Sequence, residues 1–259
     1  MCTLTVVSGS DTYRMAMNRD EKIARGTGMP CEVHEFDGTK AIYPNDDDGG
    51  TWIGANECGI ALALLNWNDI ALSARAVKTR SRGRVIPSLI DSRSQSDMHS
   101  VISVSSFTGM LPFRLVGAFP AEQEIWEWRW DSTQLTFQVH EWKSGYWFSS
   151  SLSEDRAETL RGVTCRAAQR ESDAGSVPWL RRLHASHAGG PGPFSLCVHR
   201  EDVKTLSYSE IVVTPGHVQV GHFRGSPCTM AQTEQIHAIE MERAKYTDRL
   251  VWGVSNAAI

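Results

Sequence analysis

The stretch that decides the fold opens the chain: Met1-Cys2-Thr3-Leu4-Thr5-Val6-Val7. Its β-branched residues predict a strand over residues 3–7, which begins almost at the first residue. The turn sequence Ser8-Gly9-Ser10-Asp11 follows, and residues 13–17 have the composition of a hairpin partner. This second strand is expected to end in Asn18-Arg19-Asp20-Glu21, so a polar tetrapeptide closes the hairpin that Cys2 opens.

A second strand pair is predicted further along the chain. Residues 51–54 and the apolar run Ile60-Ala61-Leu62-Ala63-Leu64-Leu65 flank the turn Asn56-Glu57-Cys58-Gly59. The continuous apolar run fits a strand that is buried on both faces, with a buried helix as the alternative. Residues from about 22 to 50 are polar, include the acidic turn Asp46-Asp47-Asp48-Gly49-Gly50, and are expected to be irregular.

Helical signals occur in three places. Residues 84–105 carry apolar side chains at helical spacing, and Ser94 followed by Asp97 gives an N-capping pattern. Residues 154–171 return to helical composition, and residues 177–186 predict a further short helix.

Between and after these helices the sequence predicts strands. Residues 114–149 are rich in aromatic and β-branched side chains, which indicates a half-buried antiparallel meander. Alternation places three tryptophans on one face of this meander, with Glu127 and Arg129 on the other. Residues 194–224 again have strand composition. Without a linker or an internal repeat, this order predicts one α+β domain over residues 1–259, in which helices cover antiparallel sheets.

The composition excludes several classes of protein. The chain has 259 residues, 41% hydrophobic and 22% charged, with a formal net charge of −4. Its one basic run, residues 78–84, is too short for a nucleic-acid footprint, so a solvated loop and no nucleic-acid partner are expected. No signal-peptide pattern and no apolar stretch of about 18 residues occur, which favours a cytoplasmic protein without a membrane span. The six cysteines are then expected to be reduced, and a homo-oligomer stays open.

Cys2 gains a chemical partner if Met1 is removed, and a small second residue favours that removal. A thiol at residue one lies beside its own α-amine, which has a pKa of about 7.7–8.0 and can accept the thiol proton at neutral pH. A nucleophile paired with an N-terminal amine is a recognised form of covalent catalysis. Taken alone, the alternative is an incidental cysteine at the start of an edge strand.

Cys2 belongs to an ordered set of short motifs. They are Met1-Cys2-Thr3, Asn18-Arg19-Asp20-Glu21, residues 50–56 (GTWIGAN), residues 59–67 (GIALALLNW), Ser81-Arg82-Gly83, residues 197–202 (CVHRED) and Gly225-Ser226-Pro227-Cys228. This set resembles the NRDE family, which is named after its tetrapeptide and typified by transport and Golgi organisation protein 2. The resemblance covers most of the chain.

The opening also resembles the choloylglycine-hydrolase branch of the N-terminal-nucleophile (Ntn) hydrolases, which includes bile-salt hydrolases and penicillin V acylases. Asn18 and Asp20 match its Arg-Asn-x-Asp motif, Asn56 begins its Asn-Glu-x-Gly motif, and Asn66 follows its apolar strand. The resemblance implies an α+β fold, a four-layer αββα sandwich with two antiparallel sheets. It also implies that Cys2 is the nucleophile, that Asp20 orients it, and that Asn66 donates to the oxyanion. One such donor contributes about 3 kcal/mol in the transition state.

Two departures from that branch bear on the substrate. Met17 stands where the branch has arginine, so Arg19 on the face of Met17, or Arg14 on the opposite face, would supply the cation. The second asparagine of the branch falls here in Ser149-Ser150-Ser151, with Ser150 as the candidate donor. These changes keep the nucleophile and weaken the case for bile salts or penicillins as substrates.

The expected site residues form two groups. Catalysis is assigned to Cys2, Asp20, Asn66, Asn18 and Arg19, and substrate contacts to Arg14, Trp52, Asn56, Trp67 and Ser150. No metal or other cofactor is expected. His184 and His187 have metal-like spacing, but no third ligand follows at helical or turn spacing, so a solvated helix end is expected. The His199-Arg200-Glu201 segment is expected to be a surface feature, and Asp46-Asp47-Asp48 lacks the twelve-residue calcium loop.

Two functions follow from these residues. The first is an amidohydrolase that cleaves a non-peptide C–N amide bond of a small-molecule amide or acyl substrate through an acyl-thioester on Cys2. The second is a non-catalytic Ntn-fold carrier for haem or acyl-group ligands, since a fold alone does not establish an activity. Haem would need an axial His, Cys, Met or Tyr, and the sequence singles out none. Retention of Met1 would favour the carrier, because it leaves Cys2 without a free α-amine.

Overall fold

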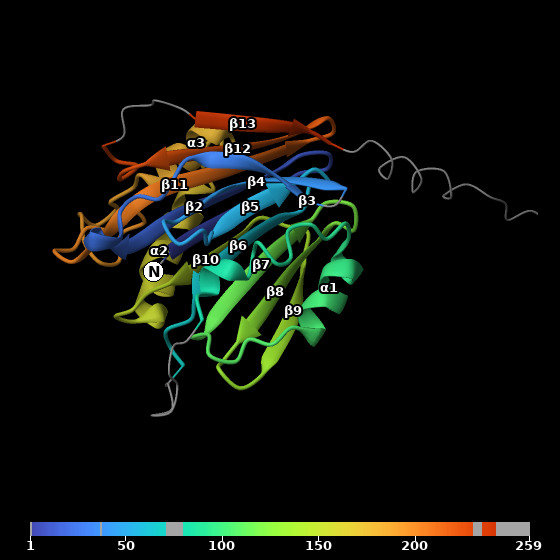
Figure 1. Ribbon diagram of the computed structural model, residues 1–259. Helices are drawn as coiled ribbons and strands as arrows, with labels where there is room; N and C mark the ends of the chain where they lie inside the picture. The colour runs from blue at the N-terminus through green and yellow to red at the C-terminus, as the bar shows by residue number, and fades with distance from the viewer. Residues whose placement is uncertain (1, 37, 71–79, 230–234, 242–259) are drawn as a thin grey trace, which may run out of the picture.

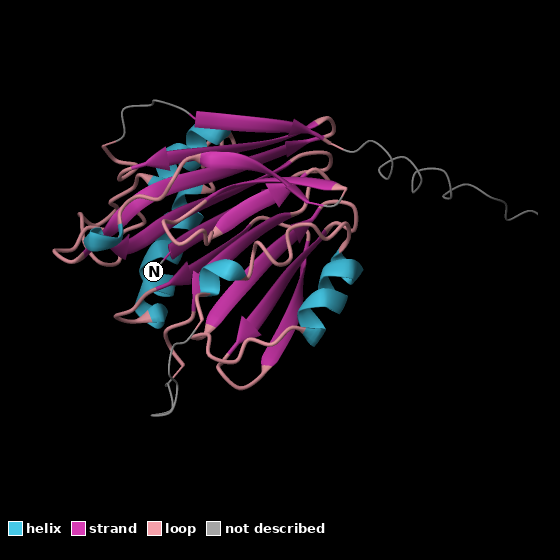
Figure 2. Cartoon of the chain, viewed as in Figure 1, coloured by secondary structure: helices cyan, strands magenta, loops and turns pink. Residues whose placement is uncertain are grey.

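The computed structural model describes residues 2–36, 38–70, 80–229 and 235–241 (Figure 1). Met1 and the first two residues of the basic run, 78 and 79, therefore lie outside the described residues. Two antiparallel sheets dominate this part of the chain, as the magenta strands of Figure 2 show. Helices are few and lie on the outer sides of the sheets.

The first sheet contains six strands within the described residues, in the order β10-β1-β2-β11-β12-β13. Their bounds are β1 (Cys2–Ser8), β2 (Tyr13–Lys22), β10 (Gly145–Ser149), β11 (Val203–Thr214), β12 (His217–Arg224) and β13 (Gln235–Glu240). The strand that begins at Cys2 thus has a neighbour on each side, although its partners are far apart in the sequence.

The second sheet contains seven strands within the described residues, and their spatial order follows the chain from β3 to β9. They are β3 (Cys31–Phe36), β4 (Thr39–Pro44), β5 (Ile53–Asn56), β6 (Ala61–Asn66), β7 (Phe113–Phe119), β8 (Glu124–Trp130) and β9 (Leu135–Glu141). Every pairing in both sheets is antiparallel.

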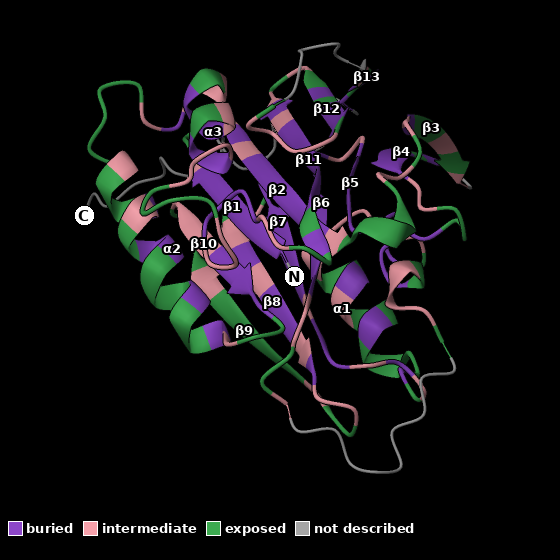
Figure 3. Ribbon diagram, turned by 90° about the vertical axis from the view of Figure 1, so that its left-hand side faces the viewer, coloured by how far each residue is buried: buried purple, intermediate pink, exposed green. Residues whose placement is uncertain are grey.

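Three layers of apolar packing hold the molecule together. The inner faces of the two sheets meet in one core, where Leu4 and Met15 of the first sheet join Ile53 and Leu65 of the second. On the outer face of the first sheet pack α2 (Glu154–Ala168) and α3 (Val177–His184). On the outer face of the second sheet pack α1 (Gln95–Val104) and the turns of residues 85–91. Figure 3 shows buried strands beneath helices whose outward sides are exposed. The expected four-layer αββα sandwich is confirmed.

The strands differ from the sequence expectation in two places. The hairpin of β1 and β2 closes within the tetrapeptide as expected, with Arg19 opposite Cys2, but β2 itself runs on to Lys22 because β11 pairs with its other edge. Residues 22–50 are not irregular throughout, since β3 and β4 form a hairpin there. The 3-10 helix η1 (Ile23–Arg25) and the acidic turn near residue 46 make up much of the remainder.

The predicted helix over residues 84–105 is only partly right. Regular helix is confined to α1, and Ser94 caps it by accepting a hydrogen bond from the Asp97 amide at 3.1 Å, as expected. The apolar residues 85–90 instead form buried turns after the 3-10 helix η2 (Arg82–Arg84). The predicted helices α2 and α3 are confirmed. No helix among the described residues has the length and apolar character that a membrane crossing requires.

The meander predicted over residues 114–149 is divided between the two sheets. Strands β7, β8 and β9 form it within the second sheet, whereas β10 crosses to the first sheet and pairs with β1. The face of β8 opposite its tryptophans is therefore not solvated. Glu127 on that face is fully buried, and Trp147 of β10 donates a hydrogen bond to its carboxylate at 3.3 Å.

Candidate active site

Cys2 lies at the start of β1, between β2 and β10. The sheet register pairs Cys2 with Arg19 of β2 and with Ser149 of β10. Directly paired residues of an antiparallel sheet project to the same face, so these three side chains lie together on the face toward the second sheet. Cys2 is 7% exposed and belongs to the core between the sheets.

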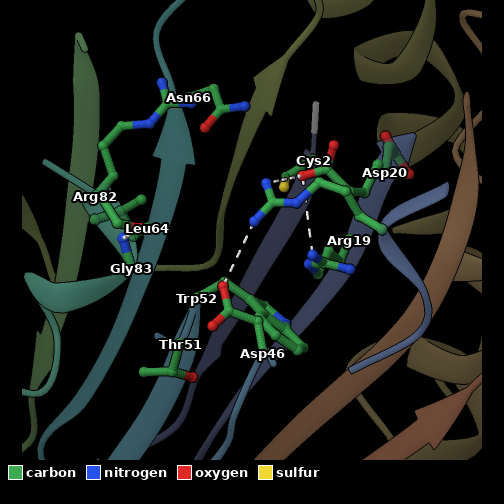
Figure 4. A pocket seen from close by; sticks show the side chains of 13 residues that line it. Cys2, Arg19, Asp20, Asp46, Thr51, Trp52, Leu64, Asn66, Arg82 and Gly83 are labelled. Carbon is green, nitrogen blue, oxygen red and sulfur yellow. Dashed lines mark hydrogen bonds and ion pairs between the residues drawn. The ribbon is translucent and has the colours of Figure 1, made fainter. Parts of the chain in front are cut away.

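A cleft that is partly open to solvent has Cys2 in its wall. The first sheet contributes Cys2, Arg19 and Asp20 to this wall, and β6 of the second sheet contributes Leu64 and Asn66. Figure 4 shows Asn66 on one side of the cleft and Cys2 with Arg19 on the other. The site is thus built where one end of the first sheet faces the second sheet.

Arg19 brings a buried cation into the cleft. Its guanidinium lies over the Trp52 ring, 4.6 Å from the centroid, and donates to the Gly26 carbonyl at 3.2 Å. Glu21 Oε2 is 3.9 Å away. Burial lowers the pKa of Arg19, while the charges of Glu21 and Cys2 oppose that shift. An arginine held in this way stays charged at neutral pH and presents a fixed positive group beside the thiol.

Asp20 is held by two buried groups. Thr205 Oγ1 donates to Asp20 Oδ1 at 2.6 Å, and Arg161 Nη2 lies 3.6 Å from Asp20 Oδ2. Burial raises the pKa of Asp20, and the Arg161 cation and the Thr205 hydrogen bond oppose that shift. The Asp20 backbone lowers the pKa of the Cys2 thiol, against the larger effect of burial. Asp20 therefore connects the nucleophile candidate to a buried ion pair.

Arg161 fixes the start of β1 from helix α2. Its Nη1 donates to the carbonyls of Cys2 at 3.2 Å and Ser149 at 3.4 Å, and to Thr3 Oγ1 at 3.0 Å. The side chain is fully buried, which is unusual for an arginine and is stable here because Asp20 and several acceptors surround it. It holds β1 and β10 together at the residue that carries the thiol.

The segment Ser81-Arg82-Gly83 forms another part of the cleft wall. It lies close to the start of β5 because the Thr51 amide donates to the Gly83 carbonyl at 2.9 Å. A Cβ on Gly83 would lie 3.0 Å from the Gly50 Cα, so glycine suits this approach. Arg82 donates to the Pro112 carbonyl at 2.9 Å, and burial lowers its pKa against the opposing charge of Cys2. Arg82 is thus a second cation in this wall, and it is half-buried.

Four of the five residues expected to carry catalysis line this cleft: Cys2, Asp20, Asn66 and Arg19. Asn18 lies on the opposite face of β2, where its amide donates to the carbonyls of His184 at 2.9 Å and Leu196 at 2.8 Å. It ties β2 to the end of α3 and to the loop that follows, so the catalytic assignment of Asn18 is corrected to a structural role.

Three of the five expected substrate contacts are also corrected. Asn56 donates to two carbonyls in residues 90–92 at 2.8 Å and accepts two amides of its own turn at 3.1 Å, so its side chain is fully used. Arg14 pairs with Val7, six residues and about 20 Å along β2 from Asp20. Ser150 accepts two amides just before α2 at 3.3 and 3.4 Å.

Only one of the two tryptophan candidates lines the cleft. Trp52 lines the cleft beneath Arg19, and its indole Nε1 is buried without a hydrogen-bond partner among the described residues. Trp67 directly follows β6 and lies outside the cleft wall. Of the two, Trp52 therefore stays the candidate for a substrate contact.

Sequence reasoning missed four residues that the fold brings close to Cys2: Ser149, Arg82, Arg161 and Thr205. Ser149 belonged to the serine triplet, but only strand register distinguishes it from Ser150. Its Oγ is buried and has no hydrogen-bond partner among the described residues. Arg82 lay in a quoted motif without a role. Arg161 and Thr205 carry no sequence signal, because each reaches Asp20 from a distant element.

The carboxylates of the cleft are engaged with arginines. Asp20 faces Arg161, and Arg25 lies 2.9 Å from Glu21 Oε2 and 3.6 Å from Asp46 Oδ2. These contacts leave the carboxylates poorly suited to hold a divalent cation. A set of metal-ligating side chains does occur among the described residues, away from the cleft wall: His187, Cys197, His199 and Cys228.

Known structures share this fold. A penicillin V acylase from Agrobacterium tumefaciens matches 93% of this chain and 86% of its own length, with a TM-score of 0.52 and 12% identity. A C2A mutant of the conjugated bile acid hydrolase from Clostridium perfringens matches 93% of this chain and 92% of its own, with a TM-score of 0.51 and 12% identity. No curated protein matches the chain. The family model Transport and Golgi organisation 2 matches residues 1–155, and the chain belongs to that family.

Proposed function

We propose that this chain is an N-terminal cysteine amidohydrolase that cleaves a non-peptide C–N amide bond. The observation that carries the proposal is the position of Cys2, which shares one cleft with the cations Arg19 and Arg82 and with the amide of Asn66. The fold that the chain shares with a penicillin V acylase and a conjugated bile acid hydrolase supports the same class of reaction. All six cysteines are free, which fits a reducing compartment such as the cytoplasm.

The proposed reaction begins with removal of Met1, which gives Cys2 a free α-amine. The amine takes the thiol proton, and the thiolate attacks the carbonyl carbon of the substrate amide. The Asn66 side chain donates to the oxyanion of the tetrahedral intermediate. The C–N bond then breaks, the leaving amine receives the proton from the α-ammonium, and an acyl-thioester remains on Cys2. Attack by water on that thioester releases the carboxylic acid and restores the thiol.

In this mechanism Asp20 is the group that positions the α-amine. Its carboxylate is held by Arg161 and Thr205, so its orientation is set before a substrate arrives. A fixed carboxylate beside the amine also favours the ammonium that forms when the thiol is deprotonated. The role requires ionised Asp20, which Arg161 supports against the cost of burial.

The charges of the cleft indicate the substrate class. Arg19 and Arg82 present two cations, and Trp52 presents a flat apolar surface beneath Arg19. Guanidinium groups pair well with carboxylates, and the indole suits an apolar or planar acyl group. We therefore expect N-acyl amides that carry a carboxylate near the scissile bond, with the acyl chain against Trp52.

The first test is the intact mass of the purified protein before and after brief treatment with iodoacetamide. We expect loss of one methionine and rapid alkylation at Cys2. Purified protein is then assayed with a panel of carboxylate-bearing N-acyl amides. Cys2→Ala abolishes turnover, while Cys58→Ser, which changes a partly exposed cysteine outside the cleft wall, retains it.

Retained Met1 together with ordinary reactivity of Cys2 would sink this mechanism. The ligand-carrier alternative would then be tested by titration with haem and with acyl-CoA. Full turnover by Cys2→Ala would exclude Cys2 as the nucleophile even if the N-terminus is processed.

A further inference from the structure

Four metal-ligating side chains lie close together outside the wall of the cleft that holds Cys2. His187 follows α3, Cys197 and His199 precede β11, and Cys228 follows β12. Their ligand atoms all lie within 4.8 Å of one another. His199 Nε2 is 3.5 Å from the Cys197 sulfur and 3.4 Å from the Cys228 sulfur. The cluster combines one buried thiol with three partly exposed groups.

These separations match those of a tetrahedral metal site. Zinc binds sulfur at about 2.3 Å and imidazole nitrogen at about 2.0–2.1 Å, which places neighbouring ligand atoms of a tetrahedron about 3.3–3.8 Å apart, with a sulfur and a nitrogen about 3.5–3.6 Å apart. Both sulfur–nitrogen distances agree with that spacing to about 0.1 Å. The separations of the whole set stay within 4.8 Å, about 1–1.5 Å beyond that spacing.

Hydrogen bonding alone does not satisfy this cluster. An imidazole nitrogen offers either one N–H or one lone pair, yet His199 Nε2 contacts two sulfurs. His187 Nε2 is buried and has no hydrogen-bond partner among the described residues. A cation at the centre would give every one of the four ligand atoms a partner.

We propose that His187, Cys197, His199 and Cys228 bind one zinc ion. On binding, the two thiols release two protons, and the two thiolates with two neutral imidazoles balance the charge of Zn²⁺. This proposal departs from the sequence-based expectation of no metal site. It considered ligands only at helical or turn spacing from His187, whereas Cys197, His199 and Cys228 arrive from the two ends of a β-hairpin. His184 does not take part: it is fully buried, with Nε2 3.0 Å from Thr5 Oγ1.

The zinc site would be structural, because its backbone holds Thr205. Val198, between two of the ligands, donates to Thr205 Oγ1 at 2.8 Å and accepts from the Thr205 amide at 3.0 Å. Ser226, two residues before Cys228, donates to the Thr205 carbonyl at 2.8 Å. Thr205 in turn donates to Asp20. The metal site therefore sets the position of the residue that orients Asp20, without contact with Cys2 itself.

The test is metal content and cobalt spectroscopy on the full chain. Protein purified from zinc-supplemented cells is expected to carry one zinc per chain by inductively coupled plasma mass spectrometry. Replacement of zinc by Co²⁺ is expected to give the visible bands of a tetrahedral site and thiolate-to-cobalt charge transfer. These readouts do not depend on any enzymatic activity, so they test the zinc site independently of the proposed amidohydrolase function.

Matched variants assign the ligands. Cys228→Ser and His187→Ala are each expected to weaken zinc binding by more than about 100-fold, because even supporting contacts of a metal site contribute 10–100-fold. Cys58→Ser and His34→Ala change the same residue types outside the cluster and should bind as the wild type does. Chains that carry no zinc and give no cobalt–thiolate bands would overturn the proposal. A Cys197–Cys228 disulfide as the stable form in cells would overturn it equally, since a disulfide leaves no thiolate ligands.

Discussion

At the scale of single residues, the environment of Cys2 explains why a local base matters. Burial raises the pKa of the Cys2 thiol and the Asp20 charge acts in the same direction, while the positive charge of the N-terminus, the Asp20 backbone and Arg19 only partly oppose them. Little thiolate is therefore present at neutral pH without a proton acceptor. A free α-amine on the same residue would supply that acceptor in place. In the proposed mechanism, processing of the N-terminus would therefore decide whether this cleft is reactive or inert.

The two serines before α2 are predicted to behave in opposite ways. Ser149 lies opposite Cys2 with an unpartnered Oγ, so Ser149→Ala should lower kcat about 100-fold if this hydroxyl stabilises the reacting groups. Ser150 binds backbone amides, so Ser150→Ala should keep its turnover and lose about 1 kcal/mol of stability. Kinetics and urea unfolding of both variants measure the contrast. Equal kinetic losses in the two variants would refute the distinction.

The buried pair of Asp20 and Arg161 is predicted to be strongly coupled. Asp20→Asn or Arg161→Met leaves one charge buried without its partner, so each should cost about 3–5 kcal/mol of unfolding free energy. The double variant should cost less than the sum of the two, because no unpaired charge remains. Urea unfolding of all four proteins measures the coupling. Arg182→Met removes an exposed arginine and serves as control; an equally small effect of Arg161→Met would contradict the prediction.

The residues of the site were predictable only where short motifs carry them. Cys2, Arg19 and Asn66 stand in or directly beside strands with recognisable sequence, so their shared cleft follows once the strands pair. Arg161 and Thr205 act over more than 140 residues of sequence separation from Cys2 or Asp20 and have ordinary neighbours. Asn56 is the opposite case. Its motif is recognisable in the sequence, but its side chain accepts hydrogen bonds from two amides of its own turn and so has a structural role.

At the scale of elements, burial decides which strands the sequence reveals. The second pair, β5 and β6, is buried on both faces and has an apolar run that begins directly after a glycine turn, so its position was predictable. The hairpin of β3 and β4 was missed. Strand β3 lies at the edge of its sheet, and Glu32 and Val33 are both exposed, so no alternation of apolar and polar residues marks it.

Strand β8 carries an ion cluster that joins the two sheets. Arg114 of β7 donates to Glu127 at 2.6 Å and also to the Phe148 carbonyl of β10 at 3.2 Å. Arg129 and His140 approach the same carboxylate at 2.9 and 3.1 Å. Alternation correctly opposed Glu127 to the tryptophans, but the sequence could not show that β10 would cover this face.

The stability of the protein should fall in acid through Glu127. Burial alone would raise the pKa of the Glu127 carboxyl. Hydrogen bonds from Arg129 and Arg114 outweigh burial and lower this pKa from 4.5 to about 2. A lowered folded-state pKa stabilises the protein above the unfolded value, and this contribution of about 3 kcal/mol is lost as pH falls from about 5 to 2. In Glu127→Gln, the unfolding free energy should be lower at pH 7 and should depend less on pH between about 5 and 2. An unchanged acid slope would contradict this.

At the scale of the whole molecule, the two functional proposals meet at one strand. Asp20 lies in β2 and lines the cleft, and its carboxylate accepts a hydrogen bond from Thr205 of β11. The cluster of His187, Cys197, His199 and Cys228 encloses the loop that enters β11 and the loop that leaves β12. The outer layer of the sandwich therefore acts on the cleft through the first sheet rather than by contact with a substrate.

Removal of zinc is consequently predicted to loosen one side of the molecule before the rest. Zinc at about 1,000 times its Kd would stabilise the fold by about 4 kcal/mol, so chelation should lower Tm by roughly 10 °C. Hydrogen exchange should rise first in residues 192–206 and 224–229, while β5 and β6 keep their protection. Cys228→Ser should start with the lower Tm and not respond to chelator. The same chelator-induced shift in that variant would mean that the stabilising metal binds elsewhere, because its ligand set would then exclude Cys228.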